Sequence, residues 1–372
     1  MRIGVPKEIK LQEHRIGLTP ESIKILIEKG HEVFVENNGG FEAGFTNEDY
    51  KNVGAKIEDK ASDIFKKSDL IVKVKEPLAN EVAMIRENQI IYTYLHLAAA
   101  KELTEGLIKS KSICIAYETV TDDNGRLPLL APMSAVAGRM SVQAGAHSLE
   151  KNQKGRGLLL GGAPGVESAN VVILGGGVVG ENAALIATGM KANVFIIDKS
   201  AERLSQLKKI FGNKIKPIES KEADLKKLIK DCDLLIGGVL IPGAEAPKLV
   251  TKDMIKSMKR GSVVVDVAID QGGCIETSKP TTHANPTYLV EDVVHYCVAN
   301  MPGGVPRTST MALNKATLPL LIKIADQGYE KTLKENKNYL SGLNVFKGEI
   351  TCKGVAEAFG LKYLPPEKAL QN

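Results

Sequence analysis

Short apolar runs alternate along the chain with amphipathic stretches. Apolar runs of four to six residues are typical of strands in a largely parallel sheet when helices lie between them. In the first part of the chain the runs that predict strands are residues 2–5, 31–35, 69–74, 89–94 and 112–117. Thr19 and Pro20 suit the N-cap and first turn of a helix that Gly30 ends. This block is therefore α/β by itself.

The second part of the chain repeats the alternation. Strands are predicted over 171–174, 193–197, 234–236, 263–267 and 296–299, and helices over 178–188, 225–230 and 251–258. Two longer helices flank this block, at 134–150 and at 310–335. The first is rich in alanine and glycine, which allows close helix packing.

These two helices predict how the domains are joined. The chain leaves the first domain near residue 130 and returns to it near residue 307. We therefore expect an α/β protein of two doubly wound domains with a cleft between them, joined by two long helices. The discontinuous first domain comprises residues 1–130 and 308–372, and the second comprises residues 131–307. A length of 372 residues suits two domains.

Composition excludes several classes of protein. The net charge of +5 is spread along the chain without a block of like charges, which argues against nucleic-acid binding. The five cysteines have no CxxC spacing, which argues against a disulfide scaffold or a zinc site and favours reduced thiols. No apolar run reaches the ~18 residues of a membrane helix, and the N-terminus lacks the apolar core of a secretory signal. We expect a cytoplasmic protein with no membrane partner.

A glycine-rich turn follows the strand predicted over residues 171–174. Gly175, Gly177 and Gly180 form G-x-G-x-x-G between this strand and a helix, where they would give the tight turn, room for a pyrophosphate and close helix–strand packing. Asp198 ends the next strand, 18 residues after Gly180, where a carboxylate would hydrogen-bond an adenosine ribose and repel a 2′-phosphate. The pattern predicts a Rossmann-like domain that binds NAD rather than NADP. The alternative is a glycine-rich turn without a nucleotide.

A nicotinamide enzyme also needs a group that moves a proton as the hydride moves. His96 stands at the end of one predicted strand and Lys75 at the end of another, where ligand sites of open α/β sheets lie. Taken singly, each residue has an ordinary structural explanation: a lysine at a strand end is usually solvated, and a histidine in an apolar run is often a core residue. Their occurrence on neighbouring strand ends favours function for both.

Further polar residues follow other strands. Asp270 comes after the run 263–267 and before Gly272 and Gly273, so that the backbone there can approach a ligand. Residues 298–304 form a third strand-to-loop passage. Arg15 lies in a polar turn and is either a surface residue or a clamp for a carboxylate. Asp266, inside an apolar run, is expected to be a structural hydrogen-bonding residue.

Over essentially its whole length the chain resembles the alanine dehydrogenases, NAD-dependent enzymes that interconvert L-alanine and pyruvate plus ammonia. The resemblance depends on long and unusual stretches. They are MRIGVPKEIKLQEHRIGLTP (1–20), VKVKEP (72–77), YLHLAA (94–99), PMSAVAGRMSVQAGA (132–146), VVILGGGVVGENAA (171–184), DVAIDQGGCIETSKPTTH (266–283) and VANMPGGVPRTST (298–310).

The resemblance implies a role for each candidate residue. Arg15 and Lys75 would hold the substrate, His96 would be the general acid and base, and Asp270 would be the second catalytic group. Residues 1–130 and 308–372 would then form the substrate domain and 131–307 the NAD domain. Besides the three glycines, the residues implied to line the NAD pocket are Ser134, Asp198, Arg203, Ser220, Val239, Leu240, Val267, Ala268, Ile269, Asp270, Lys279, Val298, Ala299, Asn300 and Met301.

The resemblance also implies a homo-oligomer, typically a hexamer. Some members carry a magnesium site built from a glutamate and a histidine on the long C-terminal helix. Here Lys323 and Gln327 occupy the corresponding stretch, so we expect no metal. Three other readings compete: the NAD(H)-binding subunit of a proton-translocating transhydrogenase, a saccharopine-type amino-acid dehydrogenase, and a nucleotide-binding sensor without catalysis.

Overall fold

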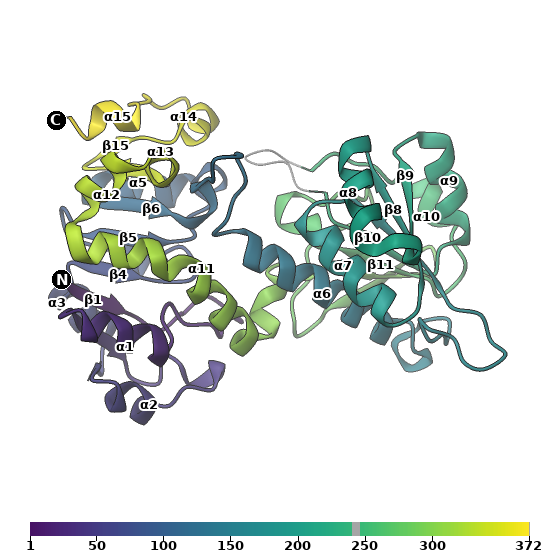
Figure 1. The fold of residues 1–372 in the computed structure, drawn as a ribbon, viewed down its shortest axis with the longest axis horizontal. Coiled ribbons are helices and arrows are strands. Elements are labelled where there is room, and N and C mark those ends of the chain that lie inside the picture. The colour runs from purple at the N-terminus through teal and green to yellow at the C-terminus, as the bar shows by residue number, and fades with distance from the viewer. Residues whose placement is uncertain (240–245, 372) are drawn as a thin grey trace. The chain divides into compact units, whose positions relative to one another are not determined.

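A computed structural model describes residues 1–239 and 246–371. The chain forms two compact units, each built around one sheet (Figure 1). Unit 1 comprises Met1–Met133 and Gly303–Asn372, and unit 2 comprises Ser134–Pro302. The border between Met133 and Ser134 lies within helix α6 (Ala131–Ser148).

Unit 1 contains a sheet in the order β15-β14-β6-β5-β4-β1-β2-β3. The strands are β1 (Arg2–Val5), β2 (Glu32–Glu36), β3 (Lys56–Glu58), β4 (Leu70–Val72), β5 (Ile90–Thr93), β6 (Ile113–Ala116), β14 (Leu343–Phe346) and β15 (Glu349–Ile350). The first six are parallel, and β14 is antiparallel to β6. Strands β1 to β6 therefore follow the doubly wound order 3-2-1-4-5-6, with the switch point between β1 and β4.

The helices of unit 1 cover both faces of its sheet. They are α1 (Pro20–Glu28), α2 (Asn47–Asn52), α3 (Ala61–Lys67), α4 (Ala79–Val82), α5 (Lys101–Ser110), α11 (Pro306–Gln327), α12 (Tyr329–Glu335), α13 (Lys337–Leu340), α14 (Lys353–Phe359) and α15 (Pro366–Ala369). Ile71, Ile91 and Cys114 pack with residues of α3, α5 and α14. On the other face, the Tyr92 hydroxyl donates to the Thr317 carbonyl of α11 (3.0 Å).

Helix α1 begins where the sequence predicts. The Thr19 hydroxyl accepts the Ser22 N–H (3.2 Å), and Pro20 occupies the first turn, where its missing N–H costs nothing. Ile23 and Leu26 are buried on the inner side of the helix. Gly30, with φ +86°, turns the chain toward β2.

Unit 2 contains a sheet in the order β12-β13-β11-β10-β7-β8-β9. The strands are β7 (Asn170–Leu174), β8 (Asn193–Asp198), β9 (Ile215–Glu219), β10 (Leu234–Gly237), β11 (Val263–Asp266), β12 (Thr287–Val290) and β13 (Val293–Tyr296). All are parallel except β12. Apart from β12, this is the same doubly wound order as in unit 1, with the switch point between β7 and β10.

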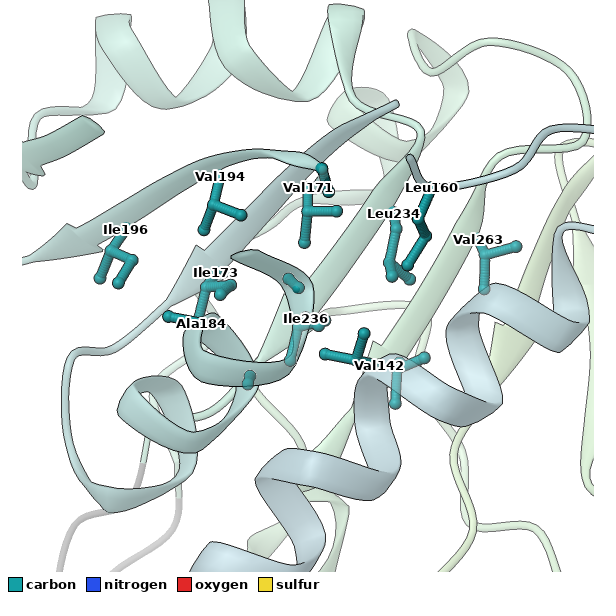
Figure 2. Packing of buried hydrophobic residues seen from close by; sticks show 14 of the residues in the cluster. Val142, Leu160, Val171, Ile173, Ala184, Val194, Ile196, Leu234, Ile236 and Val263 are labelled. Carbon is teal, nitrogen blue, oxygen red and sulfur yellow. The ribbon is translucent and has the colours of Figure 1, made fainter. Parts of the chain in front are cut away.

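Alternate residues of β7 point to two different helical layers of unit 2. Val171 and Ile173 share a core with α6, α7 (Val178–Gly189) and α8 (Ala201–Phe211), and Figure 2 shows Ile173 near Ala184 of α7. Val172 packs instead with α9 (Glu222–Asp231) and α10 (Lys252–Lys256). This two-sided burial explains why the strand reads as a continuous apolar run.

The small residues of α6 allow the close packing that the sequence predicts. A Cβ on Gly145 would lie 2.5 Å from a methyl group of Leu234, and one on Gly138 would lie 2.2 Å from the Val179 carbonyl. Both distances are shorter than any real Cβ contact, so α6 approaches β10 and α7 only because these two positions carry no side chain.

Two element predictions are wrong in detail. The last strand of unit 2 spans Val293–Tyr296 rather than 296–299, because residues 293–296 pair with β11 and β12, whereas Val298 forms only an isolated bridge with Thr281. The helix expected over 310–335 is two helices, α11 and α12, separated at Gly328. Gly328 has φ +84° and ψ 155°, a conformation that only glycine adopts readily.

The expected fold class, two Rossmann-like α/β domains, is confirmed by the two sheets. Within residues 1–239 and 246–371, no helix has the length and apolarity to cross a membrane.

Candidate active site

Three candidate residues of unit 1 follow three adjacent strands of its sheet. Arg15 comes after β1, Lys75 after β4 and His96 after β5, and β4 pairs with both of the others. Because the strands are parallel, all three segments leave the same edge of the sheet. Arg15 and Lys75 follow the two strands of the switch point, the usual place for a ligand in such sheets.

Arg15 is buried rather than a surface residue. Its Nε and Nη2 donate to the two carboxylate oxygens of Glu13 (2.7 and 2.6 Å), and its Nη1 lies 3.0 Å from the Met133 sulfur. Burial alone would lower the pKa of Arg15, but the hydrogen bonds and charge of Glu13 outweigh it and raise that pKa. One edge of the guanidinium fork therefore holds Glu13, and the guanidinium stays charged.

Lys75 is carried on a segment fixed by a buried cluster of charges. The ammonium of Lys73, 1% exposed, lies 3.0 Å from a Glu8 oxygen and 2.7 Å from a Glu81 oxygen. The other Glu8 oxygen accepts the N–H groups of Val74 (2.6 Å) and Lys75 (3.3 Å). Burial would lower the pKa of Lys73, but the charges of Glu8 and Glu81 raise it. Lys73 is thus a structural cation. Lys75, which is half-buried, lies at the edge of the sheet where β4 ends.

His96 is exposed and has an unusual backbone. Its φ of +50° and ψ of 37° are left-handed, a conformation that costs a non-glycine residue about 1–2 kcal/mol. Glu118, in the 3₁₀ turn η3 (Tyr117–Thr119), accepts the N–H of His96 (2.6 Å) and the N–H of Leu95 (3.1 Å). The carboxylate thereby holds the turn that presents the imidazole.

Tyr94 lies near both His96 and Arg15. Its ring stacks on that of His96 at 5.8 Å between centroids, and its hydroxyl donates to the Leu129 carbonyl (2.7 Å). Burial raises the pKa of Tyr94, and the charge of Arg15 partly opposes this. The tyrosine remains neutral at physiological pH and acts as a rigid neighbour of both groups.

The glycine-rich loop of unit 2 fits a dinucleotide. Gly175 has φ +91°, and a Cβ on Gly180 would lie 1.8 Å from the Gly175 carbonyl, so both positions require glycine. A Cβ on Gly177 would meet nothing within 4 Å, so its backbone faces open space. The loop follows β7 at the switch point and precedes α7, and this geometry suits a pyrophosphate.

Asp198 and Arg203 both contact this loop. Asp198 accepts the N–H groups of Gly176 (2.6 Å) and Ser200 (2.8 Å), and a carboxylate has further lone pairs for a ribose hydroxyl. Arg203 donates from Nε to the Gly176 carbonyl (2.6 Å). Ser220, after β9, donates its N–H to the Asp198 carbonyl (2.9 Å). The three residues therefore lie together beside the glycines.

Asp270 lies in the turn η6 (Val267–Gln271), which follows β11. Its carboxylate is exposed and accepts the Asn300 N–H (3.2 Å), which joins this turn to the segment after β13. Asp266 is the structural hydrogen-bonding residue expected from the sequence: it accepts the N–H groups of Ala268, Cys274 and Ile275 at 3.1–3.4 Å. Burial raises the pKa of Asp266.

The remaining NAD candidates lie in several environments. Val239 follows β10 and approaches Gly175, whereas Leu240 lies outside the described residues. Four candidates have buried side chains, so a ligand would meet their backbone: Ala268, Ile269, Val298 and Met301. Val267 and Ala299 are half-buried beside them, and half-buried Ser134 is in the first turns of α6. Lys279 is exposed and its ammonium lies 4.6 Å from the ring centre of Tyr288.

Lys323 and Gln327, which stand where some family members would carry a magnesium site, contact other side chains. The Lys323 ammonium lies over the ring of Tyr339 (5.1 Å), and the Gln327 amide donates to the Thr332 hydroxyl (3.2 Å). Among the residues that the structure describes, no three His, Cys, Asp or Glu side chains gather as a metal site requires.

Sequence reasoning missed the acidic partners of the site residues. Glu13, Glu118 and Glu181 contact Arg15, His96 and Arg203 respectively. Only Glu13 is near its partner in sequence, and no spacing rule identifies such a pair in a loop. The others come together only through the pairing of strands.

Family models match almost the whole chain. Residues 4–137 match the model described as "Alanine dehydrogenase/PNT, N-terminal domain", and residues 141–353 match "Alanine dehydrogenase/PNT, C-terminal domain". The chain belongs to the alanine dehydrogenase/PNT family. This confirms the resemblance found in the sequence motifs.

Individual members of the alanine dehydrogenase/PNT family are similar over their full length. The chain is 55% identical to the alanine dehydrogenase of Halomonas elongata over 364 residues, 98% of each chain. It is 52% identical over 372 residues to alanine dehydrogenase 2 of Staphylococcus aureus, covering 100% of both.

Solved structures agree. An L-alanine dehydrogenase superposes with a TM-score of 0.94 at 51% identity, covering 97% of this chain and 99% of the other. A transhydrogenase from Sinorhizobium meliloti gives a TM-score of 0.82 at 23% identity over 95% of this chain and 99% of the other, a likeness of fold alone.

Proposed function

We propose that this chain catalyses the NAD-dependent oxidative deamination of L-alanine to pyruvate and ammonia, and the reverse reductive amination. The observation that carries the proposal is the similarity to several proteins named alanine dehydrogenase. The chain is 52–55% identical to them over 98–100% of its length. The segments of Arg15, Lys75 and His96, which leave one edge of the unit 1 sheet, supply groups of the kind that this reaction needs.

Arg15 and Lys75 are assigned to the substrate. A guanidinium recognises a carboxylate by paired hydrogen bonds, and an ammonium attracts a carboxylate or carbonyl oxygen as a point charge. Burial of Arg15 supports this role, since a fixed and desolvated cation binds an anion more strongly than a solvated one. The Glu13 pair fixes the plane of its guanidinium before substrate arrives.

His96 and Asp270 are assigned to proton movement. Bound NAD⁺ would supply the acceptor for the hydride of alanine Cα, and loss of that hydride together with one amino proton would leave an imine. His96 would take a proton from the water that adds to the imine carbon and pass it to the imine nitrogen. It would then move the hydroxyl proton of the carbinolamine to the same nitrogen, so that the carbonyl of pyruvate forms as ammonia leaves. Asp270 would orient that water and stabilise the resulting carbinolamine. The imidazole is exposed and its backbone is fixed by Glu118, as a general acid and base requires.

The division of roles follows the boundaries expected from the sequence. Residues 1–130 and 308–372 would bind the substrate, and residues 131–307 would bind NAD. In the second part, Gly175, Gly177 and Gly180 would hold the pyrophosphate and Asp198 the adenosine ribose. The other residues implied by the family resemblance would line the rest of the pocket. The proposal also includes a homo-oligomer, a hexamer by family resemblance, that works in the cytoplasm without metal.

The test is NADH absorbance after mixing the purified protein with L-alanine and NAD⁺ at mildly alkaline pH. NADP⁺ and D-alanine serve as controls. NADH formed only from L-alanine with NAD⁺ establishes the reaction, its stereochemistry and the cofactor together. Binding of NADH without turnover would instead favour the NAD(H)-binding subunit of a transhydrogenase or a sensor. Turnover of larger amino acids alone would favour a saccharopine-type dehydrogenase.

A further inference from the structure

Two oppositely charged side chains meet the glycine-rich loop of unit 2 at one residue. The Asp198 carboxylate accepts the Gly176 N–H, and Arg203 Nε donates to the carbonyl of the same residue, both at 2.6 Å. A Cβ on Gly176 would lie 3.3 Å from the Asp198 carboxylate and 3.4 Å from Arg203 Cγ. The acid and the base are therefore close neighbours beside the nucleotide loop.

The two groups favour different cofactors. In doubly wound domains a carboxylate at the end of the second strand hydrogen-bonds the ribose hydroxyls of NAD, whereas an arginine nearby accommodates the 2′-phosphate of NADP. This chain has both groups in place. Asp198 alone therefore does not explain a preference for NAD, because the nearby Arg203 would still attract the 2′-phosphate of NADP.

The structure shows what occupies this arginine. Its Nη2 forms an ion pair with the Glu181 carboxylate of α7, and its Nη1 donates to the Gln206 side-chain oxygen (3.2 Å). With Nε on Gly176, each nitrogen of the guanidinium has an acceptor from the protein. The side chains of Arg203 and Glu181 are 27% and 36% exposed, so a nucleotide phosphate has access to them.

We propose that Glu181 is a specificity-determining residue that keeps Arg203 from binding a 2′-phosphate. Selection of NAD then depends on two carboxylates with different actions. Asp198 repels the phosphate, and Glu181 neutralises the cation that would otherwise attract it. This inference rests on the proposed function, since it assumes that the loop of unit 2 binds NAD.

The two actions predict a coupled response. Removal of the Glu181 charge alone frees Arg203 but leaves the repulsion by Asp198. Removal of the Asp198 charge alone ends the repulsion but leaves Arg203 paired. Only the double change provides both a free cation and an unopposed approach, so its effect should exceed the product of the single effects.

The experiment uses the full-length protein and four variants: Asp198→Asn, Glu181→Gln, their combination, and the combination with Arg203→Met. The readouts are the dissociation constants of NADPH and NADH from nicotinamide fluorescence, and the ratio of kcat/KM for NADP⁺ to that for NAD⁺. Glu202→Gln is the matched control, because it removes one negative charge from α8 at a carboxylate that contacts Gln206 rather than Arg203.

Relative to wild type, each variant changes the affinity for NADPH by some factor. We expect the factor of the double variant to exceed the product of the two single-variant factors at least about tenfold, which corresponds to one charge-assisted hydrogen bond. Arg203→Met should remove this gain, and Glu202→Gln should not reproduce it. The proposal would be overturned if the factor of the double variant equalled the product of the two single-variant factors. It would also be overturned if the gain in NADPH affinity remained after Arg203→Met. If a Gln or Asn variant fails to fold, Glu181→Ala and Asp198→Ser repeat the comparison. Wild-type protein that binds no NADH contradicts the proposed function itself, which is a separate result.

Discussion

The Glu118 carboxylate accepts the backbone N–H of His96 at 2.6 Å, and so holds a histidine in a left-handed conformation at the end of β5. The proposed acid and base thus depends on a residue 22 positions away in the sequence. The same carboxylate accepts the Leu95 N–H, which leaves the turn little freedom.

Glu118→Ala should lower kcat about 10- to 100-fold, because a catalytic group displaced by about 1 Å loses this much. The NADH dissociation constant should stay the same, because Glu118 is in unit 1 and the nucleotide loop is in unit 2. Glu118→Gln is the matched control: its amide oxygen can still accept both N–H groups and should preserve most of the turnover. Wild-type turnover in Glu118→Ala would exclude this positioning role.

His96→Ala and Asp270→Asn should each reduce turnover by about 10²- to 10⁴-fold, the usual contribution of a general acid or base. NADH binding, measured by fluorescence titration, should persist in both variants. Retention of full turnover by either one would remove that residue from the mechanism.

Arg15→Lys should raise the KM for L-alanine and for pyruvate more than it lowers kcat. Lysine lacks the planar guanidinium that pairs with Glu13 here and that recognises a carboxylate by paired hydrogen bonds. Initial-rate kinetics with either substrate would measure the change. An unchanged KM in a folded variant would mean that Arg15 does not bind the substrate carboxylate.

Lys73→Met should lower the free energy of unfolding by about 3–5 kcal/mol, because it leaves the carboxylates of Glu8 and Glu81 buried without a cation. Arg2→Met is the control, since the Arg2–Asp69 pair is largely exposed and screened by solvent, and should change stability little. Urea unfolding at pH 7 would compare the two. Equal losses would mean that burial of the Lys73 cluster is unimportant for stability.

A pH dependence is expected at the end of α11. Hydrogen bonds from Lys29 and from His31 hold the pKa of Asp326 below its ordinary value of 3.8. Because the folded state favours the ionised carboxylate, these contacts stabilise the protein above pH ~3.8, and the stabilisation is lost as the pH falls through the lower, folded-state pKa.

The stability difference between wild type and Asp326→Asn should therefore shrink as the pH falls below about 4.5. Urea midpoints at each pH would measure it. A difference that widens as the pH falls below about 4.5 would contradict the assignment.

The sequence predicted ten of the fifteen strands, because fully buried strands of a parallel sheet are continuous apolar runs. It missed the short or half-exposed strands β3, β9, β12, β14 and β15, which lie at or next to the sheet edges and lack such runs or pair antiparallel. It named Lys75 at the strand end but gave no sign that Lys73 is a buried structural cation. Both alternate with valine in the same motif, and only the position of Glu8 and Glu81 determines which lysine is buried. The break at Gly328 was missed because helical periodicity continues on both sides of it.

Glu8 connects two segments that are far apart in the chain. It lies in the same loop after β1 as Arg15, and it binds the ammonium of Lys73 and the N–H groups of Val74 and Lys75 after β4. A substitution that moves one segment would therefore disturb the other. An exchange of substrate loops between relatives would have to transfer residues 6–19 and 73–81 together, since Glu8 holds these two segments to each other.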